Sequence, residues 1–246
     1  MEKHEYARMF EVEDAFWWYK GLHELVLSDI NRIQGNSRLK ILDAGSGTGR
    51  LLELIGGENS FGFDFSRQAI DFQKKRNLKS LCCASISKMP FKAGEFDIIT
   101  SMDVLYHKAV SDDAKALSEL ACSLKKGGYL ILNLPAFEFL KSRHDEAVHT
   151  ARRYTKGGLK AKLAHAGFGI EKMTYRNSFL FPAAFILRMI KKNTGNHEKE
   201  IKSELEMPLK PINAILLAIL RLENRATANG FKFPFGLSVY CVARKK

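Results

Sequence analysis

The chain has 246 residues, of which 46% are apolar, and a formal net charge of +12. A chain of this size can bury a large core, so we expect one α/β domain with an insertion. The four cysteines show no metal-ligand spacing and suit a reduced, cytoplasmic setting. No secretory signal is expected at the N-terminus, and the apolar runs 179–187 and 214–220 are shorter than the ~20 residues that cross a bilayer.

The positive charge is concentrated in the C-terminal part of the chain. Residues 1–150 contain 20 Lys and Arg against 21 Asp and Glu, whereas residues 151–246 contain 19 against 6. Three interpretations of this asymmetry stay open. The basic part could bind nucleic acid, it could meet an anionic membrane surface or anionic substrate, or it could serve solubility alone.

The N-terminal residues 6–33 read as one or two amphipathic helices. Residues 16–21, Phe-Trp-Trp-Tyr-Lys-Gly, bring four aromatic side chains together, including both tryptophans of the chain. Such a cluster is typical of a seam between two helices. It could equally form a lid over a ligand, because aromatic faces attract cations.

A glycine-rich loop follows the first expected strand, residues 39–43, and opens a helix near residue 48. The loop has the pattern D-x-G-x-G-x-G at Asp43, Gly45, Gly47 and Gly49. Glycines let the backbone turn tightly and let a ligand approach closely, so the loop predicts a cradle for a nucleotide cofactor. A dinucleotide fingerprint would require its third glycine at position 50, which is Arg50.

This pattern resembles motif I of class I S-adenosylmethionine-dependent methyltransferases. In that family the loop passes beneath the methionine and ribose of the cofactor, and an acidic residue at the end of the next strand accepts the ribose hydroxyls. Residues 61–64 read as a short strand that ends on Asp64, and Ser66 is expected to cap a helix over 67–76. The alternative is that Asp64 is only a surface turn residue.

The next segment resembles the adenine-binding loop of the family. A strand over 80–84 precedes Ser85-Ile86-Ser87-Lys88-Met89-Pro90-Phe91, and another strand covers 95–103. Ser85 stands where the family usually has an aspartate, so it could accept one hydrogen bond without a charge. The cofactor-binding residues that the resemblance implies are Asp43, Gly45, Ser46, Gly47, Gly49, Asp64, Phe65, Ser85, Ile86, Ser101, Met102 and Trp18.

The residues after the strand 95–103 are expected to face the substrate. They read Asp-Val-Leu-Tyr-His over 103–107 and lack [ND]-P-P-[YF], Pro-Cys and paired glutamates. Amino-methylating nucleic acid enzymes, cytosine C5 enzymes and arginine methyltransferases are therefore disfavoured. A helix over 111–125, capped by Ser111 and ended by two lysines, is expected before a strand over 129–134.

The most polar stretch beside the expected cleft is residues 144–154, His-Asp-Glu-Ala-Val-His-Thr-Ala-Arg-Arg-Tyr. A metal site is disfavoured, because His144 and His149 would lie about 140° apart around a helix. Together with residues 16–21, this stretch resembles a bacterial and archaeal branch of class I methyltransferases, the type 11/12-like branch, often met among glycan and lipid-linked sugar genes. The resemblance runs from about residue 6 to 244 and implies that the N-terminal segment covers the cofactor. Lys20 and Leu22 depart from the arginines common in the branch.

We expect the chemistry of the site to come from the histidines and the polar stretch. If the acceptor is a hydroxyl, a base is needed to remove its proton. The catalytic candidates are His107, His144, His149 and Tyr154, and the candidates for orienting an anionic or hydroxylated acceptor are Arg152 and Arg153.

The C-terminal part supplies the last strands and an insertion. We expect a helix over 155–166, a strand over 168–176 and an antiparallel strand over 237–243. Between the strands lie an apolar segment, 179–190, a polar linker, 193–202, and a helix from about 211. Residues 212–222 are apolar nearly all round, so they should be buried in the domain, in a partner or in a membrane interface.

These elements predict an α/β fold with a doubly wound, mostly parallel sheet of seven strands in the order 3-2-1-4-5-7-6. We expect one domain, with an N-terminal helical lid over 1–36, a cofactor-binding core over 37–176, a helical insertion over 177–234 and the last strand over 235–246. The expected function is methyl transfer from S-adenosyl-L-methionine to a small-molecule, sugar or lipid-linked acceptor, at oxygen. An RNA methyltransferase, or a protein of this fold without activity, is the alternative. Nucleic acid is the less favoured partner, while a peripheral membrane contact and a homodimer stay open.

Overall fold

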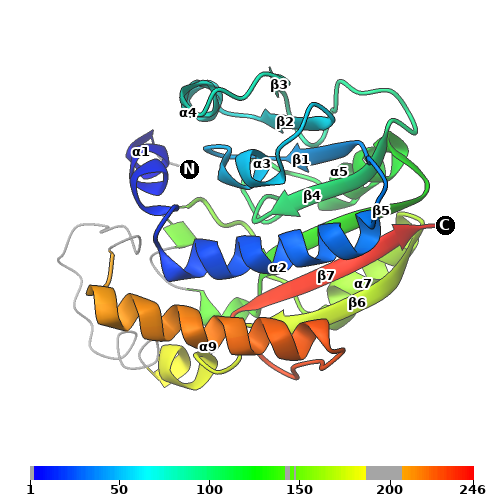
Figure 1. The fold of residues 1–246 in the computed structure, drawn as a ribbon. Helices are drawn as coiled ribbons and strands as arrows, with labels where there is room; N and C mark the ends of the chain where they lie inside the picture. The colour runs from blue at the N-terminus through cyan, green and yellow to red at the C-terminus, as the bar shows by residue number, and fades with distance from the viewer. Residues whose placement is uncertain (1–2, 142–144, 147, 187–206) are drawn as a thin grey trace.

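The fold was determined from a computed structural model, in which residues 3–141, 145–146, 148–186 and 207–246 are described. A seven-stranded sheet with the order β3-β2-β1-β4-β5-β7-β6 forms its centre, which confirms the predicted fold class and strand order (Figure 1). The strands are β1 Ile41–Ala44, β2 Ser60–Asp64, β3 Leu81–Cys83, β4 Phe96–Met102, β5 Leu124–Pro135, β6 Phe168–Arg176 and β7 Ser238–Lys245. Neighbouring strands from β3 to β5 are parallel, and β7 is antiparallel to both β5 and β6.

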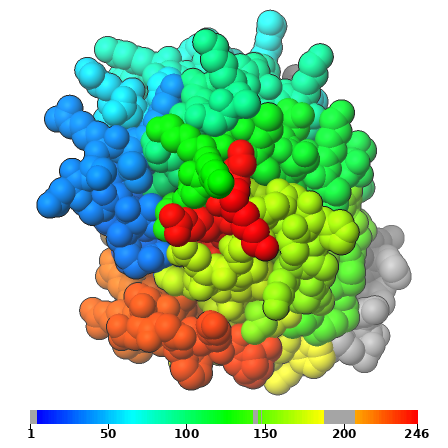
Figure 2. Space-filling view, turned by 90° about the vertical axis from the view of Figure 1, so that its right-hand side faces the viewer, coloured from blue at the N-terminus to red at the C-terminus, as the bar shows by residue number. Residues whose placement is uncertain are grey.

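Helices cover both faces of this sheet. They are α1 Lys3–Val12, α2 Trp17–Gln34, α3 Arg50–Ile55, α4 Arg67–Lys75, α5 Asp113–Ser123, α7 Lys156–His165 and α9 Lys210–Ala228. On the face nearer the viewer in Figure 1, α2 and α9 lie side by side across the sheet, while α5 and α7 lie behind it. The C-terminal residues, coloured red in Figure 2, reach the surface between green and yellow-green parts of the chain.

The two faces have separate apolar cores because successive strand residues point to opposite sides. In β4, Ile98 packs in the core that contains Val26 of α2, whereas Ile99 packs in the core that contains Leu117 of α5. A parallel strand covered on both faces therefore reads as a continuous apolar run. The carboxyl ends of parallel strands lie at one edge of a sheet, so the segments after β1, β2, β4 and β5 converge there.

The helix α9 packs along α2 on the sheet's front face. Its Asn224 Nδ2 donates to the backbone oxygen of Gly21 at 2.7 Å, and Arg221 pairs with Glu24 at 2.6 Å. Leu217 and Leu220 are buried. The exposed apolar side chains of this segment are Leu209, Ile212, Ile215 and Leu222. The described residues thus cover one face of the apolar helix α9. The linker predicted over 193–202 lies outside the described residues.

Two predictions about the helix after β4 were wrong. The cap is Asp112, not Ser111, because the Asp112 carboxylate accepts the backbone N–H groups of Ala114 and Lys115 at 2.9 and 3.0 Å. The helix also ends earlier than predicted. Lys125 and Lys126 belong to β5, because the helix ends at Ser123 and the strand begins at the fully buried Leu124.

We expect Asp112→Ala to lower the free energy of unfolding by about 1 kcal/mol, because two N–H groups at the start of α5 would lose their acceptor. Ser111→Ala is the matched control, and it should change this free energy by less than about 0.5 kcal/mol. Urea unfolding followed by circular dichroism measures both. Equal losses in the two variants would contradict the assignment of the cap.

Candidate active site

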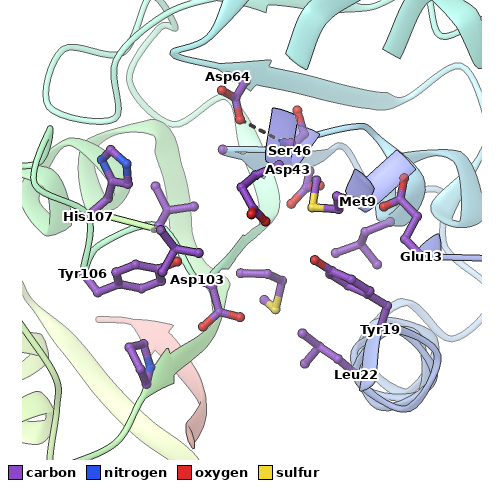
Figure 3. A pocket seen from close by; sticks show the side chains of 18 of the residues that line it. Met9, Glu13, Tyr19, Leu22, Asp43, Ser46, Asp64, Asp103, Tyr106 and His107 are labelled. Atoms are coloured by element: carbon purple, nitrogen blue, oxygen red, sulfur yellow. Dashed lines mark hydrogen bonds between the residues drawn. The ribbon is translucent and has the colours of Figure 1, made fainter. Parts of the chain in front are cut away.

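A cavity of about 620 Å³ opens where the carboxyl ends of the parallel strands converge. Its walls come from α1, α2, the loop after β1, the end of β2 and the segment after β4, as Figure 3 shows for the labelled side chains. Cavities of roughly 300–1,000 Å³ are typical of small-molecule sites. This one is large enough for a nucleoside cofactor together with part of a second molecule.

The loop after β1 needs its glycines for close packing. Gly45 has φ +78°, and a Cβ there would lie 2.4 Å from a Val104 methyl group. Gly47 has φ +53°, and a Cβ there would lie 2.9 Å from Met9 Cε of α1. Both conformations favour glycine. Gly45 also leaves no room for a side chain, whereas at Gly47 only the flexible end of Met9 lies close and the positive φ is the main obstacle. The loop therefore presents bare backbone to the cavity.

Asp64 at the end of β2 is held by this loop. Its carboxylate accepts the Gly47 N–H at 2.9 Å and the Ser66 N–H at 2.8 Å. Burial raises the pKa of Asp64, and the two backbone donors oppose that rise. Each carboxylate oxygen still has a lone pair for a further donor, so Asp64 can accept the two hydroxyls of a ribose. Ser66 caps α4 through Ala69 N–H, as predicted.

The helix α1 closes the cavity from the N-terminal side. The Tyr6 hydroxyl lies 3.5 Å from the Asp64 carboxylate. After α1, the carboxylate of Glu13 accepts the Thr48 hydroxyl and pairs with Arg76 at 2.8 Å. These contacts link the N-terminal segment to the glycine loop and to α4. The position of α1 therefore depends on the same residues that shape the cofactor cradle.

Two further carboxyl groups face the cavity from the ends of β1 and β4. Asp43 accepts the Thr100 hydroxyl at 2.7 Å, and burial raises its pKa to about 7. Asp103 accepts the Asn133 amide at 2.9 Å, and burial likewise raises its pKa to about 7. In Figure 3 the carboxyl group of Asp103 lies beside Tyr106, that of Asp43 lies nearer the middle of the view, and Tyr19 of α2 is on the opposite side from Tyr106.

The residues present fit S-adenosylmethionine, the cofactor that the sequence implies. The bare loop, the fixed carboxylate of Asp64 and the apolar side chain of Ile86 line one continuous cavity. Trp18 and Tyr19, in edge contact at 5.0 Å between ring centroids, line it from α2 and suit a sulfonium cation. When bound there, the cofactor would supply an activated methyl group.

Most of the predicted site residues line this cavity. They are Asp43, Gly45, Ser46, Gly47, Asp64, Phe65, Ser85, Ile86, Met102, Trp18, His107 and Arg153. Two predicted cofactor residues face elsewhere. Gly49 packs against Gln73 of α4, and the Ser101 hydroxyl donates to the backbone oxygen of Ala44 at 3.0 Å. Ser101 points away because strand residues alternate, so its neighbour Met102 faces the cavity instead.

The polar stretch after β5 is used mainly for internal ties. Tyr154 is buried, with its hydroxyl 2.9 Å from the Asp113 carboxylate, and burial raises its pKa. Arg153 lines the cavity but forms two hydrogen bonds to Asp145, each 2.9 Å long. Arg152, Tyr154 and His149 are not among the lining residues, and His144 lies outside the described residues.

Sequence reasoning did not assign several residues of the cavity wall. They are Tyr6, Met9, Glu13, Arg50, Asn177 and Ser238. The sequence does predict that residues 103–107 face the substrate and that the N-terminal segment covers the cofactor, and Asp103, Tyr106 and Tyr19 line the cavity. Which residues of α1 reach the site depends on how α1 folds onto the loop.

We expect Asp64→Ala to weaken the binding of S-adenosylhomocysteine by more than tenfold, because a charge-assisted hydrogen bond contributes roughly 1.5–3 kcal/mol. Gly47→Val should have a similar effect, because a β-branched residue disfavours the φ of +53° and its side chain would enter the cavity. Asp71→Asn, an exposed carboxyl on α4, is the matched control and should bind normally. Calorimetry measures the affinities. Unchanged affinity in both site variants, with intact circular dichroism, would contradict the cofactor assignment.

Comparison with known proteins supports this interpretation. The family described as "Methyltransferase domain" matches residues 42–132. The "Probable tRNA methyltransferase 9B" of Bos taurus is 27% identical over 128 residues, which cover 52% of this chain and 28% of that protein. The chain thus spans about a quarter of the length of the first curated relatives it matches.

Other relatives align over more of their length. The "Ubiquinone biosynthesis O-methyltransferase" of Thiobacillus denitrificans is 26% identical over 187 residues, which cover 64% of this chain and 80% of that protein. The crystal structure of a SAM-dependent methyltransferase from Thermotoga maritima superposes with a TM-score of 0.62 at 20% identity, and the match covers 99% of this chain and 95% of that one. Residues 42–132 therefore match a methyltransferase domain, in a chain that has the fold of class I S-adenosylmethionine-dependent methyltransferases.

Proposed function

We propose that the protein transfers a methyl group from S-adenosylmethionine to a hydroxyl of a small-molecule, sugar or lipid-linked acceptor. The observation that carries this proposal is the continuity of one cavity. Asp64 and the glycine loop line one part of it, and Asp103, Tyr106 and Asn177 line another. A cofactor held at the first part would leave room for an acceptor at the second.

The chemistry of the second part favours an acceptor with hydroxyl groups. Asn177 is fully buried, and no described residue donates to its side-chain oxygen. Ser238 at the start of β7 lines the same part of the cavity. Asn177 and Ser238 add uncharged polar groups to this wall of the cavity, so the wall suits a polar, hydroxylated molecule better than an apolar one.

A second candidate function is methylation of RNA. Two observations favour it. Residues 151–246 carry an excess of positive charge, and several relatives have names that describe tRNA methyltransferases. Positive charge provides sequence-independent attraction to phosphates. Basic and aromatic residues interleave in the short stretch Phe231-Lys232-Phe233, which is small for a stacking platform, and we therefore rank RNA second.

The acceptor class can be tested by release of S-adenosylhomocysteine from the purified protein. The probes are methyl glycosides, a nucleotide sugar, a polyprenyl-phosphate sugar, catechol and bulk tRNA, with Asp64→Ala as the inactive control. We expect turnover with a hydroxylated small molecule or the lipid-linked sugar. Turnover with tRNA alone would favour the second candidate, and binding of the cofactor without transfer to any probe would contradict the proposal.

We further propose that α9 meets an anionic membrane surface from one side. Within the described residues, none of the helices has the length and apolarity to span a membrane. The exposed apolar side chains of Leu209, Ile212 and Ile215 lie on a segment that also exposes Lys210 and Arg225. Apolar side chains bordered by cations suit peripheral binding, in which each basic residue adds about 1 kcal/mol.

We expect the protein to float with vesicles that contain anionic lipid at low salt, and to be released at high salt because the Debye length shortens. Replacing both Ile212 and Ile215 by Gln should reduce flotation at least threefold. Leu54→Gln, an exposed apolar residue on α3, is the matched control and should float like the wild type. Protein that stays in solution at low salt would rule out this contact.

A further inference from the structure

We propose that Asp103 is the catalytic base of this site, which removes the proton from the acceptor hydroxyl during methyl transfer. The inference rests on the proposed function and names the residue that would perform its proton transfer. Three observations lead to it: the way the backbone places Asp103, the groups around its carboxyl, and the hydrogen bonds that engage the competing side chains.

The backbone places Asp103 directly after the carboxyl end of β4. Its φ is +57°, in the left-handed region that is uncommon for residues other than glycine and best tolerated by Asn and Asp. The residue is held there by two bonds to Asn133 of β5. Its N–H donates to the Asn133 carbonyl at 2.8 Å, and its Oδ2 accepts the Asn133 amide at 2.9 Å. A strained position held this firmly is typical of functional residues.

The second carboxyl oxygen of Asp103 is available to the cavity. None of the hydrogen bonds among the described residues engages Oδ1, and Asp103 is a lining residue. Figure 3 shows its carboxyl beside Tyr106, on the far side of the cavity from Glu13. One oxygen fixed by an amide and one directed to open space is the arrangement that a base requires.

The surroundings of Asp103 place its protonation near neutral pH. Burial raises the pKa to about 7, and the Asn133 amide and two arginines limit the rise. The titratable and charged groups that act on it from neighbouring elements are Arg176 of β6, Arg153 after β5, Tyr106 after β4 and Tyr19 of α2. In the site without a cofactor the carboxyl holds its proton below about pH 7 and cannot accept another. A sulfonium nearby would lower this pKa, so turnover should rise with pH through a value no higher than about 7.

The other candidate bases are engaged elsewhere. His107 Nδ1 accepts the Ala109 N–H at 3.0 Å, so the proton of the neutral ring lies on Nε2, and burial lowers the His107 pKa to about 4. The Tyr154 hydroxyl is bound between the Leu105 carbonyl and Asp113. Asp43 has a similar pKa, but it lies against the glycine loop next to Ser46 (Figure 3).

The step balances with Asp103 as the proton acceptor. The acceptor oxygen forms a bond to the methyl carbon while its proton passes to the Asp103 carboxylate. The carbon–sulfur bond breaks, and its electron pair stays on the sulfur of the departing thioether. No oxidant, reductant or metal ion is needed. A positioned base typically raises the rate of such a transfer by a factor of about 10²–10⁴.

The test uses Asp103→Asn in the full-length protein, because Asn keeps the shape of the side chain and tolerates the same backbone conformation. Three quantities are measured for this variant and for Asp71→Asn, the exposed control. They are methyl transfer to the methyl glycosides and catechol, S-adenosylhomocysteine affinity by calorimetry, and the titration of ¹³C-labelled aspartate carboxyls by nuclear magnetic resonance. Circular dichroism checks that each variant folds.

We expect a resonance that titrates near pH 7 and is absent from Asp103→Asn, methyl transfer reduced at least 100-fold, and cofactor affinity within threefold of the wild type. The proposal would be overturned if the Asp103 carboxyl titrated near pH 4, or if Asp103→Asn transferred methyl groups as fast as the wild type. Loss of cofactor affinity by more than tenfold would also overturn it, since Asp103 would then hold the cofactor's ammonium group. If the wild type itself does not bind S-adenosylhomocysteine, the proposed function fails first.

Discussion

The gathering of three aspartates at one edge of a parallel sheet, two of them buried and Asp103 half-buried, is the constraint on which this site depends. Asp43, Asp64 and Asp103 follow or end β1, β2 and β4, whose parallel pairing brings them to one cavity. Burial raises the pKa of all three. Such clustering opposes the charged forms, because a carboxylate loses hydration and meets like charges. A cationic ligand would relieve this cost, and S-adenosylmethionine would bring two positive groups to the cavity, its sulfonium and its ammonium.

Charged groups also hold the N-terminal segment against the site. Glu13 is buried against Thr48 and Arg76, so the chain before α2 is bound to the glycine loop and to α4 through charged groups rather than apolar contacts alone. Burial raises the pKa of Glu13, and Arg76 opposes the rise. A lid held by a few charge-assisted bonds can open at a modest cost in free energy, whereas a lid packed in the core could not.

Sequence reasoning predicted the strands well because β-strands covered on both faces are continuous apolar runs, and the bounds of β6 agree with the prediction, 168–176. It failed where several residues offer the same local chemistry. Ser111, Asp112 and Asp113 can each cap a helix, and only the backbone angles of Asp112 decide the matter. Gly49 and Ser101 were assigned by their place in a motif, yet both pack inside the fold. The side of the strand on which a residue points cannot be read from a motif alone.

The polar stretch 145–154 holds the segment after β4 in place, and Arg153 of the same stretch also lines the cavity. Arg152 Nη1 donates to the Leu105 carbonyl at 3.3 Å, and the Tyr154 hydroxyl lies 3.1 Å from the same oxygen. The Ala151 N–H donates to the Tyr106 carbonyl at 2.8 Å. All three bonds end on the segment 103–107, which carries the carboxyl that lines the acceptor part of the cavity. A methyl transfer requires its groups in line to within a fraction of an ångström, so residues that fix this segment influence the rate through position alone.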